Sequence, residues 1–401
     1  MPKRDPVIIV GAGPAGLAVA AILAQAAVPS LVFEAEEKLP RDLRAGSFHP
    51  PTVELLDTIG VAKDFLALGI RVPRWQIRGR EEGVIVEWDL SLLADETPYP
   101  FRFHCEQFRL TPLLKARFEA LGGMVRFAHR FLDASQDADG VTARFETPGG
   151  IATARGSFLV GADGARSAVR HQMGVIFQGF TWPERFLVVG IRQDLAPHGY
   201  TYNAYVADPV DWGAIFKMPH EGPPGLWRVL FPPDPALPDA EVLSHAFAAR
   251  GLAHFLRLPG PYDIEHTNIY SVHQRVAAEF RQGRFVIVGD AAHVNNPLGA
   301  FGLNGALHAA FNLGEKLAQV WRGEADDRLL DRYVRQRRAA NVAFVQAQSI
   351  RNKQVLEEKD PAMRAGNLDE LRAIAADPVR HKEYLVRSSM IWSLRHAAGI
   401  E

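Results

Sequence analysis

The sequence predicts an α/β protein in which a parallel-sheet domain is interrupted by a mostly β lobe and followed by C-terminal helices. A strand, a glycine-rich turn, a helix and a second strand follow one another over residues 6–37. Aromatic, proline-rich and strand-like segments dominate residues 175–280, and residues 303–350 and 361–397 have helical periodicity. We therefore place the first domain at 1–72, 100–176 and 281–345, the β-rich lobe at 73–99 and 177–280, and the C-terminal helices at 346–401.

The composition excludes several classes of protein. The chain has 401 residues, of which 47% are hydrophobic and 23% charged, enough for two domains with a large core. Its formal net charge of −1 does not predict nucleic-acid binding, and its one cysteine, Cys105, leaves no internal disulfide. No leader or membrane-spanning segment is evident. We expect a cytoplasmic monomer or homodimer with no nucleic-acid or membrane partner and no metal site.

The first motif, "VIIVGAGPAGLAVA", joins the first strand to the first helix. In this GxGxxG pattern, Gly11 permits the tight turn, Gly13 lets backbone approach a pyrophosphate, and Gly16 lets the helix pack on the strand. Glu34 ends the second strand, where a carboxylate can accept hydrogen bonds from ribose hydroxyls. The pattern predicts a Rossmann-like dinucleotide site; a coincidental glycine-rich turn is the alternative.

Two later motifs extend this interpretation. In "FLVGADGARSAVR" (158–170), Asp163 follows a strand, and the alternative is that it only caps a strand-to-helix turn. In "FVIVGDAAHVNNPLGAFGLN" (285–304), Asp290 is placed to reach a polyhydroxyl chain such as ribityl, and residues 297–302 form a small-residue loop suited to a flat ring. A helix beginning near residues 302–304 favours negative charge at its N-terminus, which a reduced flavin carries.

Together, in this order and spacing, the three motifs resemble those of the para-hydroxybenzoate hydroxylase-type (group A) FAD-dependent aromatic monooxygenases, over most of residues 6–345. The resemblance implies an FAD-binding domain of the GR2 type with an inserted substrate domain. It also implies an ADP-half site at Gly11, Gly13, Ala15, Gly16 and Glu34, a pyrophosphate-side contact at Asp163, a ribityl contact at Asp290, and an isoalloxazine border at Pro297, Gly299, Gly302, Leu303 and Asn304.

Two further positions match this family, and two features depart from it. Arg44 and Gln107 lie where the family has FAD-contacting residues; the alternatives are a surface arginine and a polar residue at a helix entry. The acid usual after the third motif is replaced by Ala309, with His308 beside it. The C-terminal helices leave no room for the thioredoxin-like domain of larger relatives.

The reaction implied by the resemblance uses NADH or NADPH to reduce FAD. O2 then gives a flavin C4a-hydroperoxide, which hydroxylates an aromatic substrate of the phenolic or hydroxypyridine type. No second GxGxxG exists, so we expect the reductant to dock near Asp163, Arg166 and Arg170. The alternatives are a flavin oxidase, dehydrogenase or epoxidase of the same fold acting on a non-phenolic substrate, and an FAD-dependent carrier protein.

The catalytic candidates are Pro297, Tyr202 and His220. Pro297 borders the expected flavin ring, whereas Tyr202 and His220 are candidates by residue type and by their place in the β-rich lobe. Strand alternation predicts that Tyr202 and Tyr205 face opposite sides of the sheet. Packing of each aromatic residue is the alternative to catalysis. We expect Arg228, in the strand "LWRVLF", on an exposed sheet face, although it could anchor a substrate carboxylate.

Overall fold

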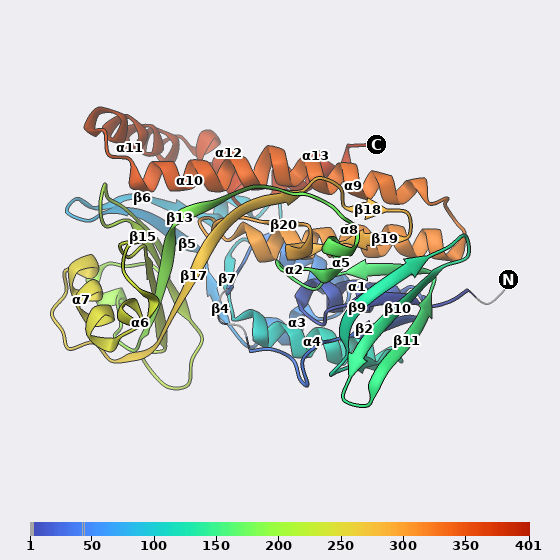
Figure 1. Cartoon of the computed structure of the whole chain (residues 1–401). Coiled ribbons are helices and arrows are strands. Elements are labelled where there is room, and N and C mark those ends of the chain that lie inside the picture. The colour runs from blue at the N-terminus through green and yellow to red at the C-terminus, as the bar shows by residue number, and fades with distance from the viewer. Residues whose placement is uncertain (1–3, 42, 44) are drawn as a thin grey trace.

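The N-terminal domain is built on a six-stranded sheet. The computed structural model describes residues 4–41, 43 and 45–401 (Figure 1). The strand order is β18-β19-β12-β1-β2-β8, and all neighbours except β18 and β19 are parallel. The strands are β1 (Val7–Val10), β2 (Ser30–Phe33), β8 (Val125–Arg126), β12 (Phe158–Gly161), β18 (Arg281–Gln282) and β19 (Phe285–Ile287). The unbroken apolar runs of β1 and β19 are buried throughout, as expected for parallel strands covered on both faces.

Layers on the two faces account for that burial. Helices α1 (Pro14–Gln25) and α8 (Phe301–Arg322) pack against each other, and α4 (Gln107–Ala120) packs on α1. A three-stranded antiparallel sheet consists of β9 (Arg130–Gln136), β10 (Val141–Thr147) and β11 (Gly150–Gly156). The rings of Phe33 and Phe145 stack at a centroid distance of 4.0 Å and join this layer to β2.

An eight-stranded sheet forms the second lobe, in the order β20-β17-β13-β16-β15-β14-β5-β6. The long partners β13 (Phe177–Ile191) and β17 (Ile264–Ala277) run as one ribbon from the nucleotide-binding side into this lobe (Figure 1). Early strands β5 (Arg74–Gly79) and β6 (Gly83–Asp89) join it, because β5 pairs in parallel with β14. The remaining members are β14 (Asn203–Ala207), β15 (Gly213–Met218), β16 (Leu226–Phe231) and β20 (His293–Val294). Two helices, α6 (Asp239–Val242) and α7 (His245–Leu256), lie between β16 and β17 in the chain.

The first domain also contains a small three-stranded sheet and two short helices. The strands of this sheet are β3 (Ser47–Phe48), β7 (Arg102–His104) and β4 (Ile70–Val72), in that spatial order. The two short helices are α2 (Pro50–Thr58) and α3 (Ala62–Leu66), which are separate because the backbone between them turns at Gly60 with φ +72°.

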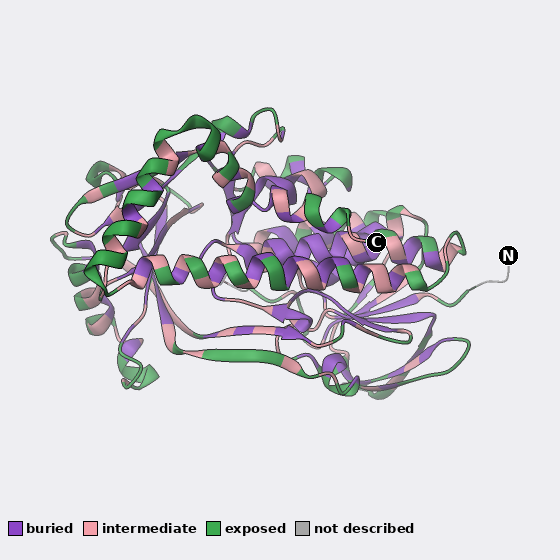
Figure 2. Ribbon diagram, turned by 90° about the horizontal axis from the view of Figure 1, so that it is seen from above, coloured by how far each residue is buried: buried purple, intermediate pink, exposed green. Residues whose placement is uncertain are grey.

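The C-terminal helices cover the second lobe. Helix α9 (Arg328–Ala340) continues through one π-helical turn (Asn341–Gln346) into α10 (Ala347–Glu357), followed by α11 (Pro361–Ala376), α12 (Pro378–Ser388) and α13 (Ile391–Ala398). Helix α10 contacts β14, and α11 contacts β6. Figure 2 shows buried residues in the sheets and inner helices, and exposed residues along the outer helices. Within the described part of the chain, no helix is both long and apolar enough to cross a bilayer.

Candidate functional site

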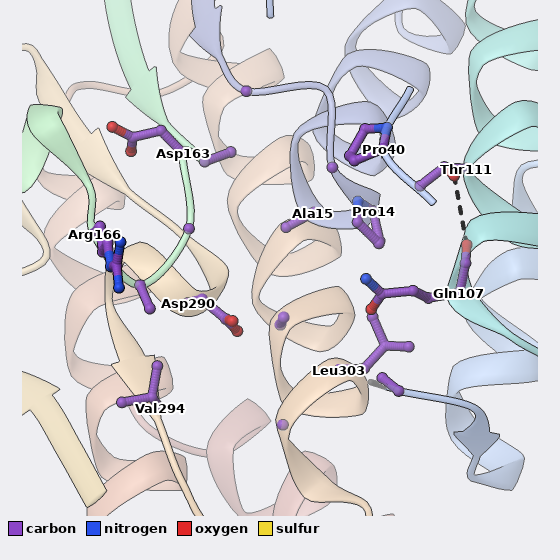
Figure 3. Close-up of a pocket in the computed structure, with 18 of the residues that line it drawn as sticks. Pro14, Ala15, Pro40, Gln107, Thr111, Asp163, Arg166, Asp290, Val294 and Leu303 are labelled. Carbon is purple, nitrogen blue, oxygen red and sulfur yellow. Dashed lines mark hydrogen bonds between the residues drawn. The ribbon is translucent and has the colours of Figure 1, made fainter. Parts of the chain in front are cut away.

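A cavity of about 760 Å³ lies where the two lobes meet. The first motif, the Asp163 turn and the segment from Asp290 to Ala306 line one side of it, and β13, β15, β16 and β17 line the other. Figure 3 shows Pro14 and Ala15 at the start of α1, with Asp163, Arg166 and Asp290 across the opening from Gln107. Three segments far apart in sequence therefore share one cavity.

The glycines of the first motif divide by what surrounds them. A Cβ on Gly11 would lie 2.4 Å from the carbonyl oxygen of Ala162, at a residue whose φ is +104°, and one on Gly16 would lie 2.1 Å from the oxygen of Gly11. Both positions require glycine for the fold alone. A Cβ on Gly13 would meet no atom within 4 Å, and this residue borders the cavity. The space above Gly13 is open to a ligand.

Glu34 lines the same end of the cavity as the first motif. Its carboxylate is buried and accepts hydrogen bonds from the backbone N–H groups of Ala12 at 2.7 Å and Glu36 at 3.1 Å. A carboxylate has about four lone-pair directions, so two remain for hydroxyl donors such as those of ribose. The turn after β1 and the end of β2 are thereby fixed relative to each other.

The Asp163 turn combines a cap with the cavity wall. The Asp163 carboxylate accepts from the Ser167 hydroxyl at 2.5 Å and the Val169 N–H at 3.1 Å, so it caps α5 (Ala168–Gln172) while it borders the cavity. Burial raises the pKa of Asp163. Arg170, expected to meet the reductant, is buried instead: it donates to the carbonyls of Ala291 at 2.9 Å and Ala165 at 2.8 Å. Its guanidinium is occupied within the protein, so that expectation was wrong.

The third motif turns Asp290 into the cavity and builds the loop that we call the flavin-side loop (residues 297–302) (Figure 3). Gly299 has φ +105° and Ala300 has φ +59°, so two successive residues are left-handed immediately before α8. Pro297, Ala300, Gly302 and Leu303 line the cavity. The first turn of α8, whose backbone N–H groups have no partner within the helix, therefore borders this space.

Asn304 and Gly299 are placed differently from the other residues that were expected to border the isoalloxazine. Asn304 is fully buried; its amide donates to the carbonyls of Ser47 at 2.9 Å and Ala300 at 2.6 Å. Gly299 donates its N–H to the Tyr205 hydroxyl at 3.2 Å. Neither residue lines the cavity. Both were expected to border the isoalloxazine, but the Asn304 side chain hydrogen-bonds protein backbone instead. Sequence spacing gave their neighbourhood but not the direction of these groups.

Of the two further cofactor candidates, Gln107 begins α4 and faces the cavity beside Thr111 (Figure 3). Arg44 lies outside the described residues.

Two of the three catalytic candidates lie away from this cavity. Tyr202 is 37% exposed and precedes β14, with its ring edge against Trp227. His220 follows β15 and contacts Glu265 at 3.0 Å, beside a separate pocket of about 400 Å³. Both residues lie outside the strands whose side chains face the cavity, and their catalytic roles stay predictions. Pro297 does line it.

Residues of the second lobe form the other wall of the cavity. Arg228 is only 3% exposed, lines the cavity and pairs with the buried Glu106 at 3.2 Å, so the expectation of an exposed arginine was wrong. Every residue of its strand "LWRVLF" is buried, and the apolar residues on both sides of Arg228 were the available signal. The wall is otherwise largely apolar, with Val188, Phe216, Met218, Leu230, Tyr270 and Val272.

Histidines near the cavity are held neutral by burial. Desolvation lowers the pKa of His49 to about 3 and that of His104 to about 4, and the positive charge of Arg102 adds to both effects. His293 of the third motif is also buried, with its pKa lowered to about 3, and neither ring nitrogen has a hydrogen-bond partner among the described residues. His293 therefore packs at this turn without a hydrogen bond to any described residue.

Comparison with known proteins gives a consistent set of similarities. A family described as an FAD binding domain matches residues 4–348. Para-nitrophenol 4-monooxygenase of Pseudomonas sp. (strain WBC-3) is 36% identical over 371 residues, covering 91% of this chain and 90% of that protein. The 6-hydroxy-3-succinoylpyridine 3-monooxygenase HspB of Pseudomonas putida (strain DSM 28022 / S16) is 31% identical over 390 residues, covering 96% and 98%.

Solved structures show the same likeness in three dimensions. The crystal structure of p-nitrophenol 4-monooxygenase PnpA from Pseudomonas putida DLL-E4 superposes with a TM-score of 0.91 at 33% identity, covering 98% of this chain and 99% of that one. The ternary complex of aklavinone-11 hydroxylase with FAD and aklavinone superposes with a TM-score of 0.77 at 30% identity, covering 89% and 70%.

Proposed function

The chain belongs to the FAD binding domain family of group A aromatic flavoprotein monooxygenases, and from this premise we propose that it hydroxylates a small phenol or hydroxypyridine with NADH or NADPH and O2. One observation carries the proposal. The cavity that the three cofactor motifs line is continuous with an apolar wall from the second lobe. A ring-shaped substrate in that wall would lie against the flavin-side loop.

The residues present fit FAD. The open space above Gly13 and the N-terminus of α1 suit a pyrophosphate, and the remaining lone pairs of Glu34 suit ribose hydroxyls. Asp290 is placed for the ribityl chain, and the N-terminal N–H groups of α8 for the pyrimidine edge of the ring. Gln107 would contact the ring from α4. Bound FAD supplies the redox chemistry, accepting a hydride from the nicotinamide and activating O2.

The substrate side selects for an aromatic ring. Phe216, Met218 and Val272 offer apolar contact, and Arg228 is the buried cation in this wall. Because Arg228 is paired with Glu106, its charge is compensated, which favours a phenol with an uncharged acceptor group over a second carboxylate. The names of two relatives, a nitrophenol and a hydroxypyridine monooxygenase, point to the same class of substrate.

The reductant, in this proposal, docks transiently at the mouth of the cavity. Arg166 lies there beside Asp163 and offers a cation to the phosphates of NADH or NADPH (Figure 3).

We retain the division of the chain into domains that was proposed from the sequence. Strands β5 and β6 share a sheet with the strands of 177–280, which supports assigning 73–99 to the substrate lobe.

The test begins with the absorbance of the purified protein. We expect a yellow protein, or a colourless one that takes up FAD, and phenols and hydroxypyridines that stimulate oxidation of NADH or NADPH with gain of one oxygen atom in the product. Consumption of reductant and O2 without a hydroxylated product would favour an oxidase. A protein that takes up no FAD would refute the proposal.

A further inference from the structure

A buried chain of hydrogen bonds lies directly behind the flavin-side loop. The Thr52 hydroxyl donates to Asn304 Oδ1 at 2.6 Å and contacts His308 Nε2 at 2.9 Å. The backbone N–H of His49 donates to the same Asn304 oxygen at 2.9 Å. The ring nitrogen Nε2 of His49 contacts the carbonyl oxygen of Gly299 at 2.8 Å. All four side chains are at most 1% exposed. These hydrogen bonds link the start of α2 to α8 and to the flavin-side loop.

The partners determine where each proton lies. The Asn304 amide nitrogen faces the carbonyls of Ser47 and Ala300, so its oxygen faces Thr52 and must accept. Thr52 gives its only proton to that oxygen, so His308 must donate through a protonated Nε2. His49 Nε2 faces the carbonyl of Gly299 and is therefore protonated as well.

The electrostatics keep these tautomers in place. Desolvation by burial lowers the pKa of His308 well below its ordinary value, and the positive charge of Arg337 lowers it further. Desolvation likewise lowers the pKa of His49 to about 3. Both rings stay neutral at neutral pH, with one nitrogen donating and the other carrying a lone pair. The direction of each hydrogen bond is therefore fixed.

The loop needs such external support. Left-handed backbone at two successive residues, one of them the non-glycine Ala300, is stable only where surrounding contacts hold it. The carbonyl of Gly299 accepts from His49, and the carbonyl of Ala300 accepts from Asn304. These hydrogen bonds thus fix two consecutive peptide groups of the flavin-side loop. Ala309, next to His308, is buried and apolar, so Asn304 and His308 are the polar side chains of α8 that contact Thr52 of α2.

We propose that Thr52 and His308 are positioning residues: by orienting Asn304 and its contacts they set the loop backbone against which the flavin ring rests. This inference rests on the proposed function for the identity of the ring. Neither residue lines the cavity, so each acts only through Asn304.

The test compares conservative and disruptive substitutions in the full-length protein. Thr52→Val and His308→Leu remove the hydrogen bonds, whereas Thr52→Ser keeps the hydroxyl and His308→Gln offers an amide N–H near the position of Nε2. Ser393→Ala is the control, since this buried hydroxyl in α13 donates to the Met390 carbonyl at 3.0 Å, away from the cavity. The measurements are the FAD dissociation constant, the visible flavin spectrum and the melting temperature.

We expect Thr52→Val and His308→Leu to raise the FAD dissociation constant about tenfold and to shift the flavin spectrum. Thr52→Ser and His308→Gln should restore both, and Ser393→Ala should change neither. The inference is overturned if the disruptive variants bind FAD with wild-type affinity and spectrum, or if the conservative ones fail equally. These readouts need no substrate, so a wild-type protein that binds FAD but hydroxylates nothing would refute the proposed function alone.

Discussion

The three glycines of the first motif are expected to respond differently to alanine. Gly13→Ala adds a methyl group that meets no protein atom within 4 Å. Gly11→Ala places the same methyl 2.4 Å from the Ala162 carbonyl oxygen at a φ of +104°. The first substitution should therefore affect only a ligand in the open space, and the second should affect the fold.

The magnitudes follow from these contacts. For Gly11→Ala, left-handed backbone costs about 1–2 kcal/mol, and the overlap with a backbone carbonyl adds about 1–3 kcal/mol. The free energy of unfolding should fall by about 2–5 kcal/mol. For Gly13→Ala, the poorer N-cap opposes a reduced unfolded-state entropy of about 0.4–1 kcal/mol, leaving the free energy of unfolding within about 1 kcal/mol of wild type. Loss of one charge-assisted hydrogen bond to a phosphate, about 1.5–3 kcal/mol, should weaken FAD binding about tenfold to a hundredfold.

Urea unfolding of the FAD-free protein and fluorescence titration with FAD measure the two effects separately. The expected result is a Gly13→Ala protein that unfolds like wild type but binds FAD poorly. Gly16→Ala, whose methyl would lie 2.1 Å from the Gly11 oxygen, should behave like Gly11→Ala. If Gly13→Ala unfolds as easily as Gly11→Ala, or binds FAD normally, our account of the phosphate site is wrong.

Three further outcomes are expected. Asp290→Ala should weaken FAD binding about tenfold, and Asp290→Asn less, since the amide keeps an acceptor for a ribityl hydroxyl; equal loss in a fluorescence titration would argue against that contact. Because burial lowers the pKa of His293 from 6.5 to about 3, the unfolded state binds more protons between these values. As the pH falls through that window, His293 should lower the free energy of unfolding by at most about 1.4 kcal/mol per unit, so the overall fall should be less steep in His293→Gln and unchanged in the exposed His245→Gln. Arg228→Leu should lower the free energy of unfolding by at most about 3 kcal/mol, because the buried Glu106 carboxylate would keep only Arg109 as an ionic partner, and adding Glu106→Leu should recover most of the loss; no recovery would exclude this cause.

Local patterns predicted the cofactor side of the cavity well. Gly11, Gly13, Glu34, Asp163 and Asp290 all line it, because each sits in a turn at the end of a β-strand. Strand ends of one parallel sheet meet at one edge, so a local signal is enough to bring such residues together.

The substrate side was predicted poorly. Residue type and location suggested Tyr202 and His220, yet the structure turns them elsewhere and brings Arg228 inward. Residue type gives no direction unless the limits of the strand are known. β14 begins at Asn203, one residue after Tyr202.

By itself, the sequence determined that the chain has a dinucleotide fold, a second lobe and a loop suited to a flavin ring, because glycines, strand ends and helix starts act within a few residues. Only the tertiary structure decided which side chains line the cavity and which lie behind its loop. Thr52 and His308 lie in distant parts of the sequence, and no local pattern indicates that their side chains meet. Their hydrogen bond exists because α2 and α8 are packed together by the core between them.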